Sequence, residues 1–222
     1  MSSSSKKLQR ELYGPSFVEV TLGAVLSVLL GGILAAGYLV AEPVETVRVM
    51  PREPNPDKTY YVTGSARSSL GKGWLRKKQM LLEQGAATIQ LSEDELNTWL
   101  ASLKTKSDGD ESGGLITPKT MNFRIADGVL QVGLPCDVSL PGFDRAVVIQ
   151  TKGTFVTAGV GFAYTPHEVM VGGLAAHRLP LIGGFVARRL ASLHEAPADL
   201  VGAWKTLSHV DVDGDRLNLV RN

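Results

Sequence analysis

Residues 20–41 read VTLGAVLSVLLGGILAAGYLVA, an uncharged stretch that lies between Glu19 and Glu42. An α-helix rises about 1.5 Å per residue, so a helix over this stretch can cross the hydrocarbon core of a bilayer, which is about 30 Å thick. The stretch therefore predicts one membrane-spanning helix at 20–41, preceded by a short leader at 1–19. Everything after it belongs to a domain held at a bilayer surface.

A cleaved signal peptide is the alternative to a retained anchor. The Ala-Ala-Gly sequence at 35–37 offers the small residues that a signal peptidase accepts. However, the apolar stretch is longer than the usual signal-peptide core of about 7 to 15 residues, and the leader carries Glu11 and Glu19. We therefore expect the anchor to be retained.

Small residues recur at every fourth position of the predicted span, at Gly23, Ser27, Gly31 and Ala35. This spacing places them on one face of a helix, where a second helix can approach closely. The pattern predicts a homodimer through the membrane helix. Gly and Ala are also common in membrane helices that do not dimerise, so the spacing leaves both interpretations open.

The charges that flank the span give a weak indication of its orientation, because basic residues are almost equally frequent on both sides. They are Lys6, Lys7 and Arg10 before the span, and Arg48, Arg52 and Lys58 after it. The basic pair in the short leader favours a cytoplasmic amino terminus, and a long carboxyl-terminal segment can be translocated regardless of its charge. We therefore expect the domain to lie outside the cytoplasm, in the periplasm or at the cell surface, as part of the cell envelope.

The composition of the segment after the span excludes some classes of function. It contains roughly 180 residues, enough to bury a core, and equal numbers of basic and acidic residues. The basic footprint expected of a nucleic-acid-binding protein is missing. The sequence contains a single cysteine, Cys136, so no disulfide can form within the chain.

Proline marks the boundary between the anchor and the domain. The sequence PREPNP at 51–56 disfavours a helix and is typical of an extended linker. We therefore expect residues 42–58 to form a Pro-rich stalk and residues 59–222 to form one α+β domain. This domain should begin with a strand at Thr59–Thr63, whose residues favour β-structure.

A helix is predicted at 73–84, with Trp74 on a broad apolar face and a basic cluster of Arg76, Lys77 and Lys78 opposite. A basic cluster of this kind can contact anionic lipid headgroups. It can equally be an ordinary solvated helix face, which is what runs of charge usually are.

The strongest local signal is Ser92-Glu93-Asp94-Glu95, a capping box in which Ser92 and Glu95 satisfy each other's backbone amides. A helix should therefore start there. Apolar residues then recur at helical spacing, at Leu96, Trp99, Leu100 and Leu103. This stripe either lines a ligand groove or belongs to an ordinary filled core, and periodicity alone does not separate the two.

The segment at 121–171 favours strands punctuated by turns. Asp127-Gly128 predicts a hairpin, Pro166 is expected to separate the two strands of another, and Asp213-Gly214 predicts a terminal one. Short turns without intervening helices are typical of antiparallel pairing.

The sequence contains no complete catalytic or cofactor-binding motif of the kinds considered below. Asp211, Asp213 and Asp215 begin like a calcium loop, but Arg216 stands where the loop needs glycine and Asn222 where it needs glutamate. The four histidines are widely spaced, and the sequence contains no Gly-x-Ser-x-Gly and no phosphate-binding loop. We expect a protein that is not an enzyme and carries no metal or cofactor.

The sequence LSEDELNTWL at 91–100, downstream of a membrane span, resembles the opening of YpmS-like and related envelope proteins of the tubular lipid-binding (TULIP) type. Residues 172–189, where Leu-Pro-Leu at 179–181 leads into an amphipathic helix, and the hairpin sequence VDVDGDRL at 210–217 look like the final helix and strands of that group. The resemblance covers most of residues 85–220. It departs from the group in the helix containing Trp74 and in the acidic loop at 105–114.

This resemblance implies an α+β fold in which a curved antiparallel sheet packs on amphipathic helices, with an apolar concavity that holds lipid in some members. Two functions follow from it. In one, the domain binds a hydrophobic ligand such as lipid, with the bilayer as its partner. In the other, the concavity is filled core and the domain is a non-catalytic scaffold for another envelope protein.

Overall fold

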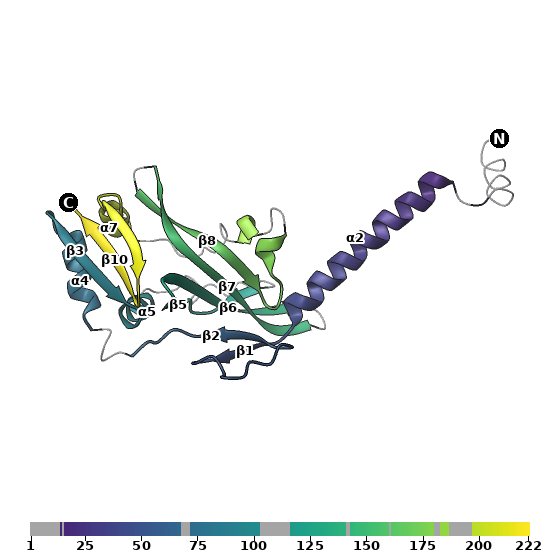
Figure 1. The fold of residues 1–222 in the computed structure, drawn as a ribbon, viewed down its shortest axis with the longest axis horizontal. Coiled ribbons are helices and arrows are strands. Elements are labelled where there is room, and N and C mark those ends of the chain that lie inside the picture. Colours follow the sequence, from purple (N-terminus) through teal and green to yellow (C-terminus); the bar gives the residue numbers. More distant parts are fainter. Residues whose placement is uncertain are drawn as a thin grey trace. The chain divides into compact units, whose positions relative to one another are not determined.

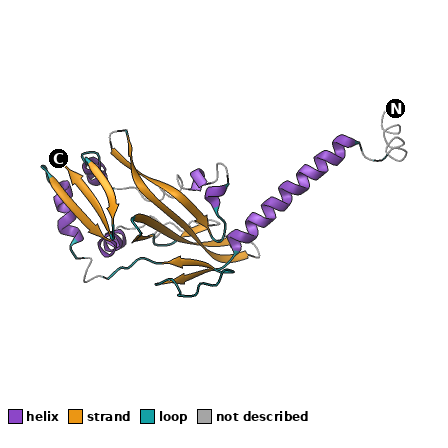
Figure 2. Ribbon diagram, in the orientation of Figure 1, coloured by secondary structure: helices purple, strands orange, loops and turns teal. Residues whose placement is uncertain are grey.

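The computed structural model describes residues 14, 16–67, 72–102, 116–140, 143–159, 161–179, 183–186 and 197–222 (Figure 1). Its contacts divide the chain into two compact units, residues 1–40 and residues 41–222. The described part of the first unit is mainly an apolar helix, and the second unit is a mostly antiparallel α+β domain with a few helices (Figure 2). The α+β class predicted from the sequence is confirmed at this level.

Helix α2 spans Phe17–Ala41, and none of its residues is buried. Ser16 and Glu19 cap its start, since the Glu19 carboxylate accepts from the Ser16 N–H at 3.1 Å and the Ser16 hydroxyl accepts from the Glu19 N–H at 3.3 Å. Twenty-five helical residues extend about 37 Å. Among the described residues, this helix is the one long and apolar enough to cross a bilayer, as predicted.

The second unit opens with a small parallel sheet. Strand β1 (Val44–Val47) pairs with β2 (Thr59–Val62) in the register Val44 to Thr59. The Pro-rich sequence at 51–56 lies in the connection between these two strands. Part of the segment expected to be a stalk is therefore a paired strand.

The largest sheet is antiparallel, in the order β4-β6-β7-β8, and β5 pairs with β6 on the same edge as β4. Its strands are β4 (Ile116–Pro118), β5 (Asn122–Ala126), β6 (Val129–Leu140), β7 (Phe143–Ala158) and β8 (Gly161–Val171). The predicted hairpin at Asp127-Gly128 is confirmed. Both turn residues have positive φ, 54° and 71°, which aspartate and glycine tolerate better than other residues.

The turn expected at Pro166 is wrong, because β8 runs through this residue without a break. Pro166 lies on the outer strand of the sheet, a position where proline is tolerated. Pro166 pairs with Gly153 at a register shift between β7 and β8. A Cβ atom on Gly153 would overlap the backbone of Thr165, so glycine is what allows the two strands to approach here.

A second antiparallel sheet has the order β3-β10-β9, with β3 (Ala87–Ser92), β10 (Arg216–Arg221) and β9 (His209–Asp213). The terminal hairpin predicted at Asp213-Gly214 is confirmed, and Gly214 has a φ of 58°. Strand β10 is the middle strand, and its Leu219 stands opposite Ile89 of β3.

The helices of this unit whose full bounds are described are α4 (Trp74–Leu82), α5 (Glu93–Ser102), α7 (Ala198–Trp204) and the 3₁₀ turn η2 (Ala176–Arg178). The predicted capping box of α5 is confirmed, because the Ser92 N–H donates to Glu95 at 2.9 Å and the Glu95 N–H donates to the Ser92 hydroxyl at 3.3 Å. The amphipathic helix implied before residue 189 is described only at 183–186, and residues 187–196 lie outside the described part.

Polar side chains of α5 connect it to two other segments. The buried Asn97 amide donates to the carbonyls of Ser65 and Phe123 at 2.8 and 2.7 Å, and its oxygen accepts from the Phe123 N–H at 2.7 Å. Glu93 accepts from the N–H groups of Ser65 and Ile125. The polar side of α5 is therefore buried against the backbone of β5 and of the segment that follows β2.

The end of α4 is held by a residue of β10. The buried Arg221 guanidinium donates to the carbonyls of Gly85, Leu81 and Met80 at 2.6, 2.8 and 3.2 Å. These carbonyls lie at the carboxyl end of the helix, where backbone oxygens lack helical partners and a positive charge is favourable.

Strand β2 lies against the large sheet. The Tyr61 ring occupies the space above Gly133 of β6, where a Cβ atom would overlap it. Burial raises the pKa of Tyr61 to about 12. The opposite side of the same sheet carries the residues described next.

Candidate functional site

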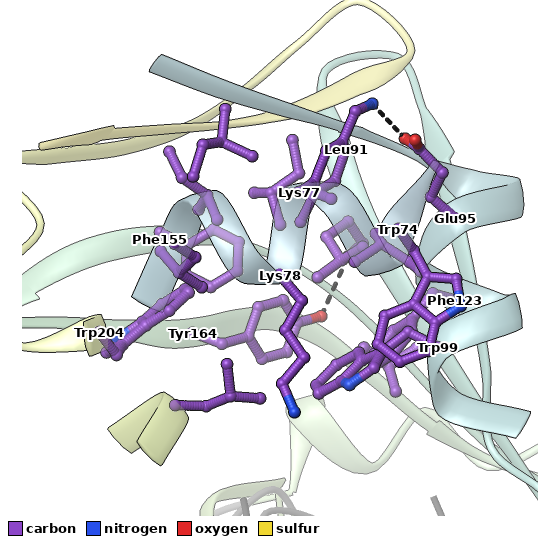
Figure 3. Close-up of a pocket in the computed structure, with 18 of the residues that line it drawn as sticks. Trp74, Lys77, Lys78, Leu91, Glu95, Trp99, Phe123, Phe155, Tyr164 and Trp204 are labelled. Carbon is purple, nitrogen blue, oxygen red and sulfur yellow. Dashed lines mark hydrogen bonds and ion pairs between the residues drawn. The ribbon is translucent and has the colours of Figure 1, made fainter. Parts of the chain in front are cut away.

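A cavity of about 770 Å³ lies inside the second unit, between the two antiparallel sheets and the helices α4, α5 and α7 (Figure 3). All five of these elements contribute side chains to its wall. Protein interiors are packed so closely that voids larger than a water molecule are few. A space of about 770 Å³ is far larger than a packing void of that kind.

The aromatic part of the wall contains all three tryptophans of the chain, Trp74, Trp99 and Trp204. Phe155 stands between two other rings, with centroid distances of 5.9 Å to Tyr164 and 5.8 Å to Trp204. The Trp204 indole N–H donates to the Phe162 carbonyl at 2.7 Å, which fixes that ring. The aromatic side chains thus offer a large apolar surface to a ligand. The Trp204 N–H already has a hydrogen-bond partner and does not need one from the ligand.

The aliphatic part of the wall is built from strands and helices that are distant in sequence. Its members are buried residues that also belong to the hydrophobic core: Leu81, Ile89, Leu96, Leu130, Val132, Leu200, Leu217 and Leu219. The core is thus arranged around the cavity instead of filling the space between the two sheets.

The neutral polar groups deep in the wall already have partners. The Tyr164 hydroxyl donates to the Leu130 carbonyl at 3.0 Å and lies 3.1 Å from the Thr151 hydroxyl (Figure 3). Burial raises the pKa of Tyr164 to about 12, so the phenol is neutral at physiological pH. Because these groups are satisfied internally, the inner cavity favours an apolar occupant over a polar one.

Charged side chains contribute to the wall from α4 and α5. Lys77 forms an ion pair with the buried Glu95 at 2.6 Å, drawn as a dashed line in Figure 3. Lys78 forms a looser pair with Asp199 of α7, with 3.4 Å between the nitrogen and the oxygen. The basic cluster predicted on α4 is therefore divided, since Arg76 is exposed while the two lysines face the cavity.

The four residues of the predicted α5 stripe have different positions. Leu96 and Trp99 line the cavity, while Leu100 is buried in the surrounding core and is not part of the wall. Leu103 lies outside the described residues. The stripe gave no indication of Trp74, Trp204, Phe155 or Tyr164, which the packing of other elements brings to the same wall.

The predicted helix-packing residues, Gly23, Ser27, Gly31 and Ala35, all lie on α2 and are exposed. Their spacing places them on one face of this helix. A second helix packed on that face stays a prediction.

The potential metal-ligating side chains of the described residues are dispersed. Within the described ranges, no three histidine, cysteine, aspartate or glutamate side chains lie close enough together to hold a metal ion. Cys136 is buried, and burial raises its pKa to about 11, so its thiol is protonated at physiological pH. The charged groups that the described wall offers a ligand are Lys77, Lys78 and Glu95.

Comparison with known proteins returned no match among protein-family models, curated proteins or solved structures. The resemblance to YpmS-like and tubular lipid-binding proteins therefore stays a prediction.

Proposed function

We propose that this chain is a single-pass membrane protein whose carboxyl-terminal domain binds a hydrophobic ligand, such as a lipid, in the cavity between its two antiparallel sheets. The observation that carries the proposal is the cavity of about 770 Å³ with its three tryptophans and predominantly apolar wall. Sites for small molecules and cofactors usually enclose about 300 to 1,000 Å³ and are lined by apolar and aromatic side chains.

The energetics of such a cavity favour an acyl chain. Each methylene group moved from water into an apolar enclosure contributes about 0.8 kcal/mol. The aliphatic wall offers such groups close contacts, and its polar atoms deep inside do not require a partner from the ligand. In this proposal the antiparallel sheet is curved around amphipathic helices, which keeps its two layers apart and the cavity open.

The proposal places the domain outside the cytoplasm, with α2 as a retained anchor. Full-length protein is expected to stay in the membrane fraction after carbonate extraction, because α2 is long enough to span the bilayer. Intact-mass measurement should find the leader still attached. A soluble product that begins near Tyr38 would instead identify the segment as a cleaved signal peptide.

Native mass spectrometry of the full chain, released from nanodiscs prepared without detergent washing, tests the ligand directly. The domain should carry a co-purified hydrophobic molecule, and Val132→Phe should greatly reduce its occupancy, because this change places a ring where the cavity is now open. Val156→Phe is the matched control, since Val156 lies on β7 of the same sheet, is 45% exposed and does not line the cavity.

The scaffold hypothesis predicts that the same samples carry no bound ligand. Wild-type protein that carries no ligand, and takes up none when lipids are added, would remove the support for a binding cavity. Equal ligand occupancy in Val132→Phe and wild type would show that the ligand binds elsewhere.

A further inference from the structure

We propose that the ligand of this cavity is an anionic amphiphile, whose apolar tail lies against the tryptophans and whose acidic headgroup is bound by the ammonium group of Lys78. The inference rests on the proposed function and adds the chemical class of the ligand. It comes from the way in which the charges at the cavity are paired.

Two cations and one carboxylate belong to the described wall, namely Lys77, Lys78 and Glu95. Glu95 is 4% exposed, and its carboxylate binds both the Lys77 ammonium at 2.6 Å and the Ser92 N–H at 2.9 Å. Removing Lys77 from this short, buried pair would leave the Glu95 charge without its counter-ion, which is costly. Lys77 is therefore committed to the protein's own structure.

Lys78 is held much less firmly. Its partner Asp199 is 3.4 Å away, and the two side chains are 31% and 46% exposed. Exposed ion pairs of this kind contribute little to stability, typically below about 1 kcal/mol. The ammonium group of Lys78 can thus exchange Asp199 for another anion at small cost.

The position of Lys78 suits a headgroup. Its side chain leaves α4 on the same helical face as Trp74 and Leu81, which line the cavity. In the view of Figure 3 it runs past Tyr164 and ends near Trp99. An acyl chain inside the cavity would therefore place a terminal carboxylate or phosphate within reach of a partly solvated cation.

Helix α4 itself carries no negative charge that would repel an acidic headgroup. The nine residues of this helix include Arg76, Lys77 and Lys78 and no acidic residue. Asp199 stands as the competing anion for Lys78, and its other carboxylate oxygen accepts from the Leu200 N–H at 2.9 Å. Removing the Asp199 charge should therefore strengthen the binding of an anion to Lys78.

Tryptophan fluorescence provides a direct measurement, because all three tryptophans line the cavity and α2 contains none. Full-length protein in phosphatidylcholine nanodiscs would be titrated with a dibrominated fatty acid, its uncharged methyl ester and a dibrominated lysophosphatidate. Bromine quenches tryptophan only at short range, so probe dissolved in the bilayer does not mimic probe in the cavity. The carboxylate and phosphate probes show which headgroup the site accepts.

Both anionic probes, or one of them, should bind the wild type about tenfold more tightly than the ester, since a charge-assisted hydrogen bond is gained. Lys78→Gln should remove this preference and leave ester binding unchanged, while Lys78→Arg should keep it. Asp199→Asn should increase the affinity for the anionic probes. Arg76→Gln is the matched control, because Arg76 lies on the same helix, is exposed and does not line the cavity.

The outcomes separate this inference from the proposed function. Quenching by the ester and the acid with equal affinity, unchanged in Lys78→Gln, would overturn the anionic headgroup and leave the hydrophobic cavity site standing. Failure of all three probes to quench the wild type would overturn both. If Lys78→Gln failed to fold, the response of Asp199→Asn would decide, because unchanged anion affinity in that variant contradicts the competition proposed here.

Discussion

Arg221→Met should lower the free energy of unfolding by about 3 to 4 kcal/mol, because it leaves three carbonyls near the end of α4 without their shared donor. Hydrogen bonds to a charged group contribute more than neutral ones, and part of this gain is offset by the cost of burying the guanidinium. Urea denaturation of the full-length protein in nanodiscs, followed by tryptophan fluorescence, measures the change in the unit that contains all three tryptophans.

Two further variants show whether the stability contributed by Arg221 comes from the geometry of its guanidinium or from its charge. Arg221→Lys keeps the positive charge but lacks the planar fork of five donors, so its loss should be intermediate. Arg216→Met alters an exposed residue of the same strand and should change stability by less than about 0.5 kcal/mol. Equal stability of Arg221→Met and wild type would mean that water replaces the guanidinium at these carbonyls.

Asn97→Ala is the second change expected to be severe, with a loss of about 3 to 5 kcal/mol. The substitution leaves two carbonyls and one N–H group unpaired at a residue that is 5% exposed. Each unsatisfied buried group costs about 1 to 3 kcal/mol. Hydrogen exchange should also become faster at Phe123, whose amide loses its acceptor.

A near-isosteric variant tests whether donors or shape matter at this position. Asn97→Asp keeps the side-chain outline but turns an oxygen toward the carbonyls of Ser65 and Phe123, so it should be at least as damaging as alanine. Gln79→Ala removes an exposed amide from α4 and should be nearly neutral. A mild effect of Asn97→Ala, similar to that of Gln79→Ala, would contradict the bridging role assigned to the amide.

Features encoded over a few residues could be predicted from the sequence. The capping box at Ser92 and the turns at Asp127-Gly128 and Asp213-Gly214 satisfy their own backbone groups locally, so their signals did not depend on the rest of the fold. The turn predicted at Pro166 was wrong because whether proline interrupts a strand depends on its place in the sheet, here on an outer strand opposite Gly153. That environment is created by pairing with residues outside the local sequence.

The cavity was only partly visible in the sequence for a related reason. Helical spacing identified the side of α5 that faces the cavity, with Leu96 and Trp99. The other aromatic residues of the wall are contributed by α4, α7 and the large antiparallel sheet. The helical spacing also did not show that polar residues of α5 are buried. Asp94, Glu95 and Asn97 are buried, although charged and amide side chains in a helix usually mark its solvent side.

The central place of β10 in its sheet has a consequence for the order of folding. Leu219 pairs with Ile89, about 130 residues earlier in the chain, so β3 and β9 gain a shared neighbour only after a long loop has closed. Contacts of this separation slow folding, and apolar surface stays exposed to other chains in the interval. Leu217 and Leu219 also form part of the cavity wall, so we expect the pairing of β10 to complete the compartment late in folding. A hydrophobic molecule already present at that moment would be enclosed as the domain folds and could act as a template for it.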